Sequence, residues 1–173
     1  ASIMARILVT GSVDVPQPDR IVFSLKVYDT GSEQFIFGRN YGGKTELLRL
    51  IAHRAADELM KHFGEKPIYT SKILFVSLRD GNNEIYMMDY DGFRQRRITF
   101  NDTIDILPSW SSNNEKIMYT SYRHSTNDLF LFHLYSGKLD LLSTGGVNYA
   151  ADWSPTEDRI VYTSSKEGNA EIF

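Results

Sequence analysis

Hydrophobic and polar residues alternate over residues 7–37 in the manner expected of β-strands. The two clearest runs cover residues 7–15 and 20–28, and Pro16-Gln17-Pro18-Asp19 separates them as a turn. In the second run the apolar residues share one face: Ile21, Phe23, Leu25 and Val27. A third strand is expected through residues 35–37. This pattern predicts an antiparallel sheet that is covered on one side.

A single long helix is predicted after this sheet. Thr45 can cap its N-terminus, Gly64 can end it, and Pro67 prevents it from resuming. Its apolar residues recur at intervals of three and four and form one stripe: Leu48, Ile51, Ala52, Ala55, Leu59 and Phe63. We therefore predict a partial α/β domain over residues 1–66, an α+β arrangement of antiparallel strands and one long helix. Residues 67–72 are predicted to be a linker.

An internal repeat occupies the rest of the chain. Trp110–Ser121 aligns with Trp153–Ser164 at an offset of 43 without a gap, and residues 73–77 match residues 117–121 at an offset of 44. The same offsets relate three tripeptides: Glu84-Ile85-Tyr86, Asp128-Leu129-Phe130 and Glu171-Ile172-Phe173. A period in the low forties is typical of β-propeller blades, each of which is a small antiparallel sheet.

Turn residues divide each repeat into strands. Asp91-Gly92 is expected to close a hairpin between residues 85–88 and 94–99, and Ser136-Gly137 has the same role in the next repeat. Residues 73–173 hold about 2.3 repeats, whereas closed propellers have roughly four to eight blades. The sequence therefore predicts an incomplete β-propeller of WD40-like antiparallel blades. We expect a fragment of a longer protein, with exposed sheet edges that allow self-association.

The segment Gly38–Thr45 matches the phosphate-binding loop pattern G-x-x-x-x-G-K-[ST]. In such a loop the backbone amides from Gly38 to Gly43 would surround phosphate groups, while Lys44 would reach their outer oxygens and Thr45 would bind Mg²⁺. A phosphate-binding loop requires further strand–helix units of a parallel sheet, and antiparallel repeats follow here instead. We therefore favour a structural interpretation, in which Gly42 and Gly43 loosen a strand-to-helix turn, Thr45 caps the helix and Lys44 is solvated.

Composition excludes several classes of function. The 19 Lys and Arg residues against 22 Asp and Glu give a net charge of −3, so no global basic field attracts nucleic acid. The chain has no Cys, which excludes disulfides and thiolate zinc sites. No apolar run approaches the roughly 18 residues needed to span a bilayer, so neither nucleic acid nor membrane insertion is expected.

Catalytic motifs are also missing from the sequence. The four His residues form no pair at i, i+4 with a neighbouring Glu, and no G-x-S-x-G elbow is present. The basic cluster Arg94, Arg96 and Arg97 is best explained as a solvated hairpin strand, with Arg97 on the opposite face from the other two. We therefore expect no enzyme activity, no catalytic residues, no cofactor and no metal site.

The repeats resemble those of TolB-type propellers. The residues that carry the resemblance are Pro108-Ser109-Trp110-Ser111 and Trp153-Ser154-Pro155, each followed by a strand that ends in Tyr-Thr-Ser. Upstream, Ala52-His53, Ala56-Asp57 and residues 70–77 resemble the junction between the N-terminal domain of that family and its first blade. This likeness covers nearly the whole chain.

The resemblance implies a non-enzymatic scaffold for protein interactions in the bacterial cell envelope. It implies a periplasmic location and a part in Tol-Pal envelope integrity and protein import. The implied partners are the peptidoglycan-associated lipoprotein, bound through the propeller, and other Tol proteins, with docking on blade loops or sheet edges. The blade repeats are shared with prolyl-oligopeptidase-like enzymes, so a propeller fragment of such a hydrolase is the alternative, and a nucleotide-binding protein using Gly38 to Thr45 is the third.

Overall fold

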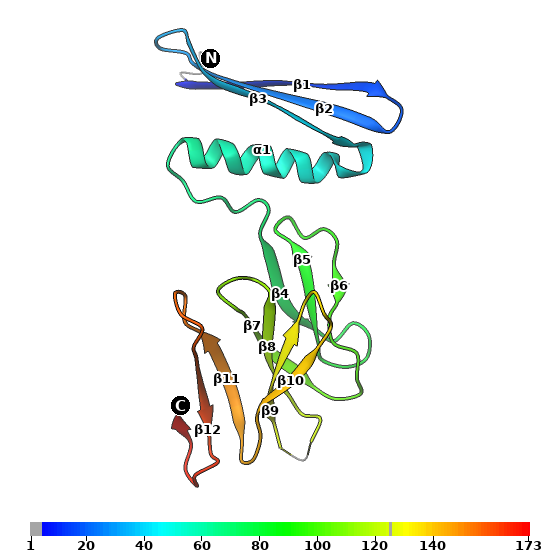
Figure 1. The fold of residues 1–173 in the computed structure, drawn as a ribbon, viewed down its shortest axis with the longest axis vertical. Coiled ribbons are helices and arrows are strands. Elements are labelled where there is room, and N and C mark those ends of the chain that lie inside the picture. The colour runs from blue at the N-terminus through cyan, green and yellow to red at the C-terminus, as the bar shows by residue number, and fades with distance from the viewer. Residues whose placement is uncertain (1–4, 125) are drawn as a thin grey trace. The chain divides into compact units, whose positions relative to one another are not determined.

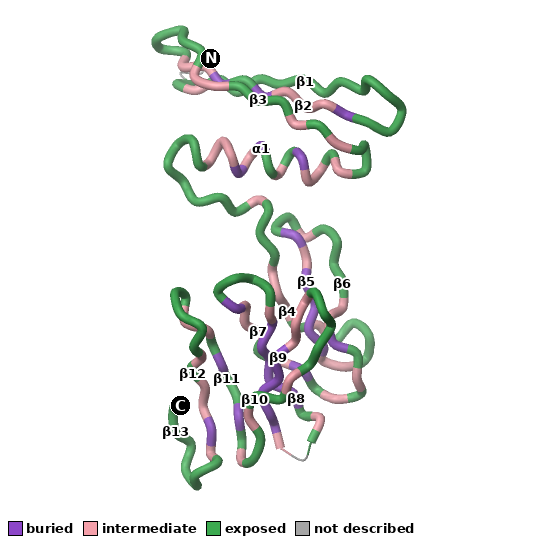
Figure 2. The backbone as a smooth tube through the Cα atoms, in the orientation of Figure 1, coloured by how far each residue is buried: buried purple, intermediate pink, exposed green. Residues whose placement is uncertain are grey.

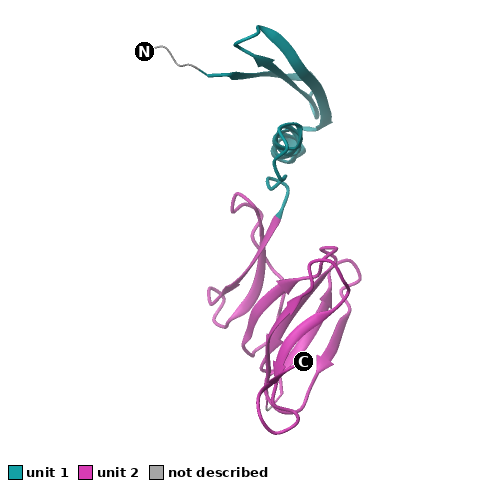
Figure 3. Cartoon of the chain, turned by 90° about the vertical axis from the view of Figure 1, so that its left-hand side faces the viewer, with its two compact units in different colours: residues 1–71 teal, residues 72–173 magenta. Residues whose placement is uncertain are grey.

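The computed structural model describes residues 5–124 and 126–173. The chain divides into two compact units, Ala1–Ser71 and Lys72–Phe173 (Figure 3). The first unit holds three strands and the long helix, and the second holds antiparallel sheets alone. The predicted fold class, an α+β part followed by an incomplete propeller, is confirmed.

The first unit is a three-stranded antiparallel sheet with one helix against it (Figure 1). Strands β1 (Ile7–Gln17), β2 (Arg20–Asp29) and β3 (Gln34–Lys44) pair in chain order, and helix α1 (Leu48–His62) follows them. Leu25, Val27 and Ala55 form the buried core, with partly buried residues around them: Ile7, Phe23, Ile36, Phe37, Tyr41 and Leu59. Burial of this apolar surface holds the helix on the sheet.

The first hairpin is tighter than predicted. The structure extends β1 to Gln17, which pairs with Arg20, so Pro18 and Asp19 alone make the turn. Pro16 therefore lies within the strand, where it has no amide hydrogen to donate. The register shifts between Asp14 and Gln17, and this irregularity accommodates the proline.

The glycine-rich segment is a strand and not the flexible turn that the sequence predicted. Strand β3 was expected over residues 35–37, but it continues to Lys44 along β2. A Cβ on Gly38 would lie 3.0 Å from the Leu25 carbonyl oxygen, and one on Gly43 would lie 2.8 Å from Ile51 Cδ1. Glycine is present at these positions because the sheet backbone and the helix approach closely there.

The start of the helix also differs from the prediction. Thr45 opens a 3₁₀ turn, Thr45–Leu47, and its amide donates to the Asp19 carbonyl oxygen at 3.0 Å, so it does not cap α1. The N-cap of α1 is Leu47, and no side chain caps it. Of the predicted apolar stripe, Ile51 and Ala55 are buried and Leu59 packs on the core, while three residues are exposed: Leu48, Ala52 and Phe63.

The end of the helix follows the prediction. Gly64 has φ +79°, its amide donates to the Lys61 carbonyl oxygen, and the Glu65 amide donates to the Met60 carbonyl oxygen at 2.9 Å. This pair of hydrogen bonds is the Schellman arrangement, in which a left-handed residue after the helix satisfies its last carbonyls. A glycine takes that conformation without steric cost.

The second unit consists of three antiparallel sheets, with four strands in the middle one. The first sheet holds β4 (Lys72–Ser77), β5 (Glu84–Asp89) and β6 (Arg96–Arg97). The second holds β7 (Asp105–Trp110), β8 (Lys116–Ser121), β9 (Asp128–His133) and β10 (Leu139–Ser143). The third holds β11 (Asn148–Trp153), β12 (Ile160–Ser164) and β13 (Glu171–Ile172). Corresponding strands recur at the offsets of 44 and 43 found in the sequence.

The hairpin turns of the repeats lie at the predicted glycines. Gly92 and Gly137 have φ +83° and +70°, which tight hairpins require. The strand predicted over residues 94–99 is shorter, because Arg94 has a positive φ of 51° and only Arg96–Arg97 pair in the ladder. Beyond them the amides of residues 98 and 99 both donate to the Ile85 carbonyl oxygen.

Apolar cores lie between neighbouring sheets of the second unit. Buried residues of this unit gather on β5, β8 and β9 (Figure 2). The first core joins Ile85 of the first sheet to residues of the second: Ile117, Tyr119 and Phe130. The second core joins the opposite face of the second sheet to Ala151 of the third: Met118, Leu129 and Leu131. Trp110 and Trp153 pack against these cores, as their repeat spacing predicts.

Candidate protein interaction site

The residues of the phosphate-loop motif do not form a loop. Gly38 pairs with Lys26, Gly43 with Ile21 and Lys44 with Arg20 along the β2–β3 ladder. In such a ladder successive amides point to opposite edges of the strand, so they do not converge on one anion. Lys44 is exposed, as expected. This geometry is that of a strand end and not of a phosphate cradle.

Three loops come together at one end of the first and second sheets. They cover residues 78–83, 98–104 and 122–124, and we call them the junction loops. The Asn82 side-chain amide donates to the Thr103 carbonyl oxygen, and the Tyr122 amide donates to the Ile104 carbonyl oxygen at 3.0 Å. These contacts hold the three loops side by side.

The junction loops expose large apolar side chains. Phe100 is 74% exposed, and three others on these loops are also exposed: Leu78, Ile104 and Tyr122. Arg97 lies over the Phe100 ring, with its guanidinium carbon 5.0 Å from the ring centroid. Aromatic residues and arginine are the residue types that contribute most of the binding energy in many protein interfaces.

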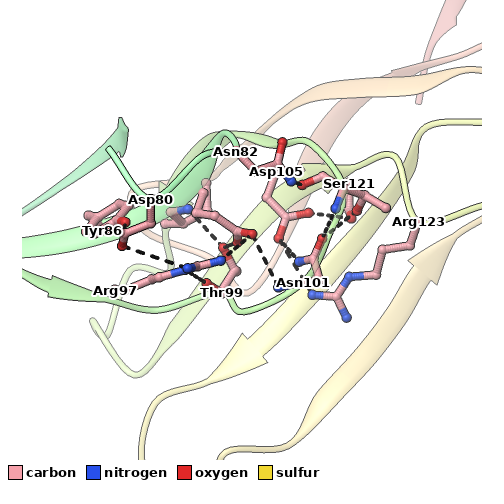
Figure 4. A network of polar contacts seen from close by, with 12 residues as sticks. Asp80, Asn82, Tyr86, Arg97, Thr99, Asn101, Asp105, Ser121 and Arg123 are labelled. Carbon is pink, nitrogen blue, oxygen red and sulfur yellow. Dashed lines mark hydrogen bonds and ion pairs between the residues drawn. The ribbon is translucent and has the colours of Figure 1, made fainter. Parts of the chain in front are cut away.

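A buried polar network connects the junction loops to the strands beside them (Figure 4). Glu84 is completely buried at the start of β5. Its carboxylate accepts hydrogen bonds from Thr99 Oγ1 at 2.5 Å, from Arg97 Nη2 at 2.7 Å and from the Asn101 amide at 3.2 Å. A buried carboxylate needs this degree of compensation, because removal from water is costly for an unpaired charge.

Asp105, the second carboxylate of the network, is also completely buried. It accepts hydrogen bonds from Ser121 Oγ at 2.5 Å and Asn101 Nδ2 at 2.6 Å, and Arg123 Nη2 lies 3.6 Å away. Arg123 also donates to the Tyr119 hydroxyl at 3.1 Å, and burial raises the pKa of Tyr119. Asn101 therefore connects the two carboxylates, and the network fixes residues from four strands and two loops relative to one another.

The sequence did not reveal this role for Arg97. Alternation placed it opposite Arg94 and Arg96, and it was interpreted as solvated, but its side chain is only 21% exposed and pairs with Glu84. The missing information was the partner, which lies 13 residues away on a neighbouring strand. Arg96 and Arg94 are exposed, as predicted.

The network of Glu84 and Asp105 holds the junction loops in fixed positions. The carboxylates of Glu84 and Asp105 are already engaged by cations and hydrogen-bond donors, so their lone pairs are used within the fold. Among the residues that the structure describes, no group of three or more His, Asp or Glu side chains is arranged to hold a metal ion. The arrangement presents apolar side chains on well-supported loops, which suits the docking of a protein partner.

Antiparallel sheets that repeat at a fixed period and pack face to face define a β-propeller type of repeat protein. The model of the TolB beta propeller domain, PD40, matches residues 60–173. The chain therefore belongs to the TolB beta-propeller family. This confirms the resemblance found in the sequence.

Two curated relatives cover almost the whole chain. The Tol-Pal system protein TolB of Desulfosudis oleivorans is 36% identical over 170 residues, which are 98% of this chain and 39% of that protein. The protein TolB homolog of Chlorobaculum tepidum is 29% identical over 174 residues, 100% of this chain and 40% of that protein. The chain thus spans about two fifths of the length of the curated relatives that it matches.

A solved structure has the same fold. TolB from Acinetobacter baumannii superposes with a TM-score of 0.82 at 21% identity, over 96% of this chain and 43% of that one. Within the described ranges, the helix of the first unit lacks the length and apolar character needed to cross a membrane.

Proposed function

We propose that this chain is a non-enzymatic module for protein interactions in the Tol-Pal system of the bacterial cell envelope. Its partners are the peptidoglycan-associated lipoprotein and other Tol proteins, and its place of action is the periplasm. In this role it contributes to envelope integrity and to protein import. Family membership supports the proposal, because curated relatives bear the name Tol-Pal system protein TolB.

The observation that carries the proposal is the exposed aromatic Phe100 on the junction loops. A side chain of this size at 74% exposure gains from burial in a complementary pocket, since each Å² of apolar surface removed from water contributes about 25 cal/mol. The network of Glu84, Arg97 and Asn101 holds its loop in place before binding. A loop that is already ordered loses less conformational entropy when a partner binds.

The proposal is tested by measuring binding of purified peptidoglycan-associated lipoprotein to the immobilised chain. Phe100→Ala is expected to weaken binding by at least about tenfold, as truncation of an interface hot spot does. Tyr135→Ala is the matched control, because Tyr135 is 86% exposed on a turn outside the junction loops. Equal affinity of both variants would exclude the junction loops as the docking site, and no binding of the unchanged chain would exclude this partner.

A further inference from the structure

A short segment after helix α1 is held on the helix mainly by one buried side chain. Asp57 Oδ1 accepts a hydrogen bond from the Tyr69 amide at 2.7 Å. Its Oδ2 accepts bonds from the Thr70 amide at 3.0 Å and the Thr70 hydroxyl at 2.5 Å. His53, one turn earlier on α1, donates from Nδ1 to the Tyr69 carbonyl oxygen at 2.5 Å. We call residues 68–71 the strap, and these four bonds fasten it to α1.

Apolar burial contributes little to the fastening of the strap. Ile68 is 37% exposed, Thr70 is exposed, and Tyr69 is only partly buried. The apolar core that holds α1 on its sheet includes Ala55 and Leu59, but within the described ranges it includes no residue of the strap. A segment with few buried apolar contacts opens at a lower cost in free energy than the core beside it. The strap can therefore open while the helix stays folded.

The strap lies directly before the second unit in the chain. The first unit ends at Ser71, and strand β4 begins at Lys72. Residues 66 and 67 precede the strap, are exposed, and follow the last hydrogen bond of the helix end. An open strap would therefore add residues 66–71 to the free chain between the units. Six extended residues span up to about 20 Å.

We propose that the strap sets the length of the linker between the two units. When the strap is fastened, the chain is held on α1 as far as residue 70, and the linker is short. When it opens, the predicted linker over residues 67–72 is free along almost its whole length. Asp57 controls the change between the two forms, because three of the four fastening bonds depend on its carboxylate.

Limited proteolysis measures how often the strap opens. Chymotrypsin cleaves after Tyr69 when the strap is open, so the cleavage rate follows the population of the open form. Asp57→Ala should raise this rate about 10- to 100-fold, because hydrogen bonds to a charged group are lost. Glu58→Ala is the matched control, since it removes the next carboxylate of α1, which bonds to Arg39 and Tyr41. It should leave the rate unchanged, and equal rates in Asp57→Ala and Glu58→Ala would overturn the proposal.

A second variant acts from the strap and leaves the helix sequence unchanged. Thr70→Val removes the hydroxyl that donates to Asp57 but keeps the amide, so cleavage after Tyr69 should rise about 3- to 10-fold. The double variant Asp57→Ala/Thr70→Val should be cleaved no faster than Asp57→Ala alone, because the two side chains share one interaction. Effects that multiply in the double variant would contradict the assignment of Asp57 as the fastening group.

Amide hydrogen exchange separates opening of the strap from unfolding of the helix. In Asp57→Ala the protection factors of the amides of residues 55–59 should stay as they are in the unchanged chain, since the apolar core still holds α1 on the sheet. A fall in these protection factors by the same factor as the rise in cleavage would mean that the helix and the strap open together. That outcome would overturn the proposal.

Discussion

The two junctions between the sheets of the second unit use equivalent positions in different ways. At the first junction the buried carboxylates are Glu84 and Asp105, and cations lie beside both. At the second junction the corresponding residues are Asp128 and Asn148. Asn148 is neutral and bonds to neutral partners: Ser143, Ser164 and the backbone of Asn127 and Gly145. All four side chains are completely buried.

Comparison of the two junctions shows which contact is common to both repeats and which feature belongs to one of them. At both junctions a Ser at the end of the next strand donates a hydrogen bond to a buried side-chain oxygen. Ser121 donates to Asp105, and Ser164 donates to Asn148. The repeat therefore requires a buried acceptor at this point but no particular charge. At this position the first junction has a charged residue, Asp105, and Arg123 lies 3.6 Å from it. The loop at that junction also carries the exposed Phe100.

The largest effect is expected when the first junction loses Arg97, one of its two cations. Arg97→Ala would leave the buried Glu84 carboxylate without its ion pair, and loss of one partner of a buried pair costs about 3–5 kcal/mol in the free energy of unfolding. Urea denaturation followed by tryptophan fluorescence reports on this unit alone, because Trp110 and Trp153 both lie in it.

Arg96→Ala is the control for this variant, since Arg96 precedes Arg97 in the same short strand but is exposed. It should change the free energy of unfolding by less than about 0.5 kcal/mol, as surface substitutions do. If Arg97→Ala were as mild as Arg96→Ala, the charged character of the first junction would contribute nothing to its stability.

The next effect comes from exchanging the acceptors of the two junctions. Asn148→Asp should cost about 2–3 kcal/mol, because a carboxylate would face the carbonyl oxygens of Gly145 and Asn127 that the amide now donates to. Asp105→Asn should cost only about 1–2 kcal/mol. It keeps the bond from Ser121 to Oδ1 and loses the bond from Asn101 Nδ2 to Oδ2. The denaturation midpoints of both variants show which one loses more stability. A larger loss in Asp105→Asn than in Asn148→Asp would contradict the view that the second junction requires a neutral residue at this position.

The repeat architecture could be predicted from the sequence because short sequence patterns mark its strands and turns. Alternation and the offsets of 43 and 44 located the blades, and Gly92 and Gly137 marked hairpins through a conformation that few other residues adopt. Each of these signals is carried by a short stretch of sequence and does not require knowing which residues meet in space. For that reason the fold class could be predicted without a structure.

Features that depend on distant partners could not be predicted in this way. Gly43 was interpreted as a turn residue. The structure shows instead that a side chain at this position would collide with Ile51, which approaches from the helix. Arg97 was interpreted as solvated because alternation gives the face of a side chain and not the residue that meets it. The exposed Phe100 was likewise hidden, since a hydrophobic residue in a sequence carries no mark of exposure.

The first unit also holds a buried carboxylate, Asp57, and its hydrogen-bond donors are neutral. Asp57 on α1 accepts hydrogen bonds from the amides of Tyr69 and Thr70 at 2.7 and 3.0 Å and from the Thr70 hydroxyl at 2.5 Å. It thereby fastens to the helix part of the segment that was predicted as a linker. Burial acts to raise the pKa of Asp57, but these hydrogen bonds outweigh it and lower the pKa below 3.8.

A lowered pKa in the folded state means that Asp57 stabilises the fold above its ordinary pKa. This contribution is lost as the pH falls through the lowered value. The protection factors of the amides of residues 69 and 70, taken relative to their intrinsic exchange rates at each pH, should therefore fall below about pH 4. Asp57→Asn should lose about 1–2 kcal/mol of protection there without this pH dependence. Glu46→Gln, at an exposed acid, is the control, and an unchanged pH profile in Asp57→Asn would exclude Asp57 as the fastening group.

The smallest effect is expected at Asp128, the carboxylate of the second junction. Its Oδ2 lies 2.5 Å from His124 Nδ1, but within the described part of the chain its buried Oδ1 has no hydrogen-bond partner. Asp128→Asn removes a charge that the junction does not fully compensate, so the free energy of unfolding should change by less than about 1 kcal/mol or rise. Glu84→Gln, at the equivalent position, should lose about 2 kcal/mol, because it weakens the bond to Arg97. Equal losses in the two variants, measured by urea denaturation, would mean that both junctions depend on charge to the same extent.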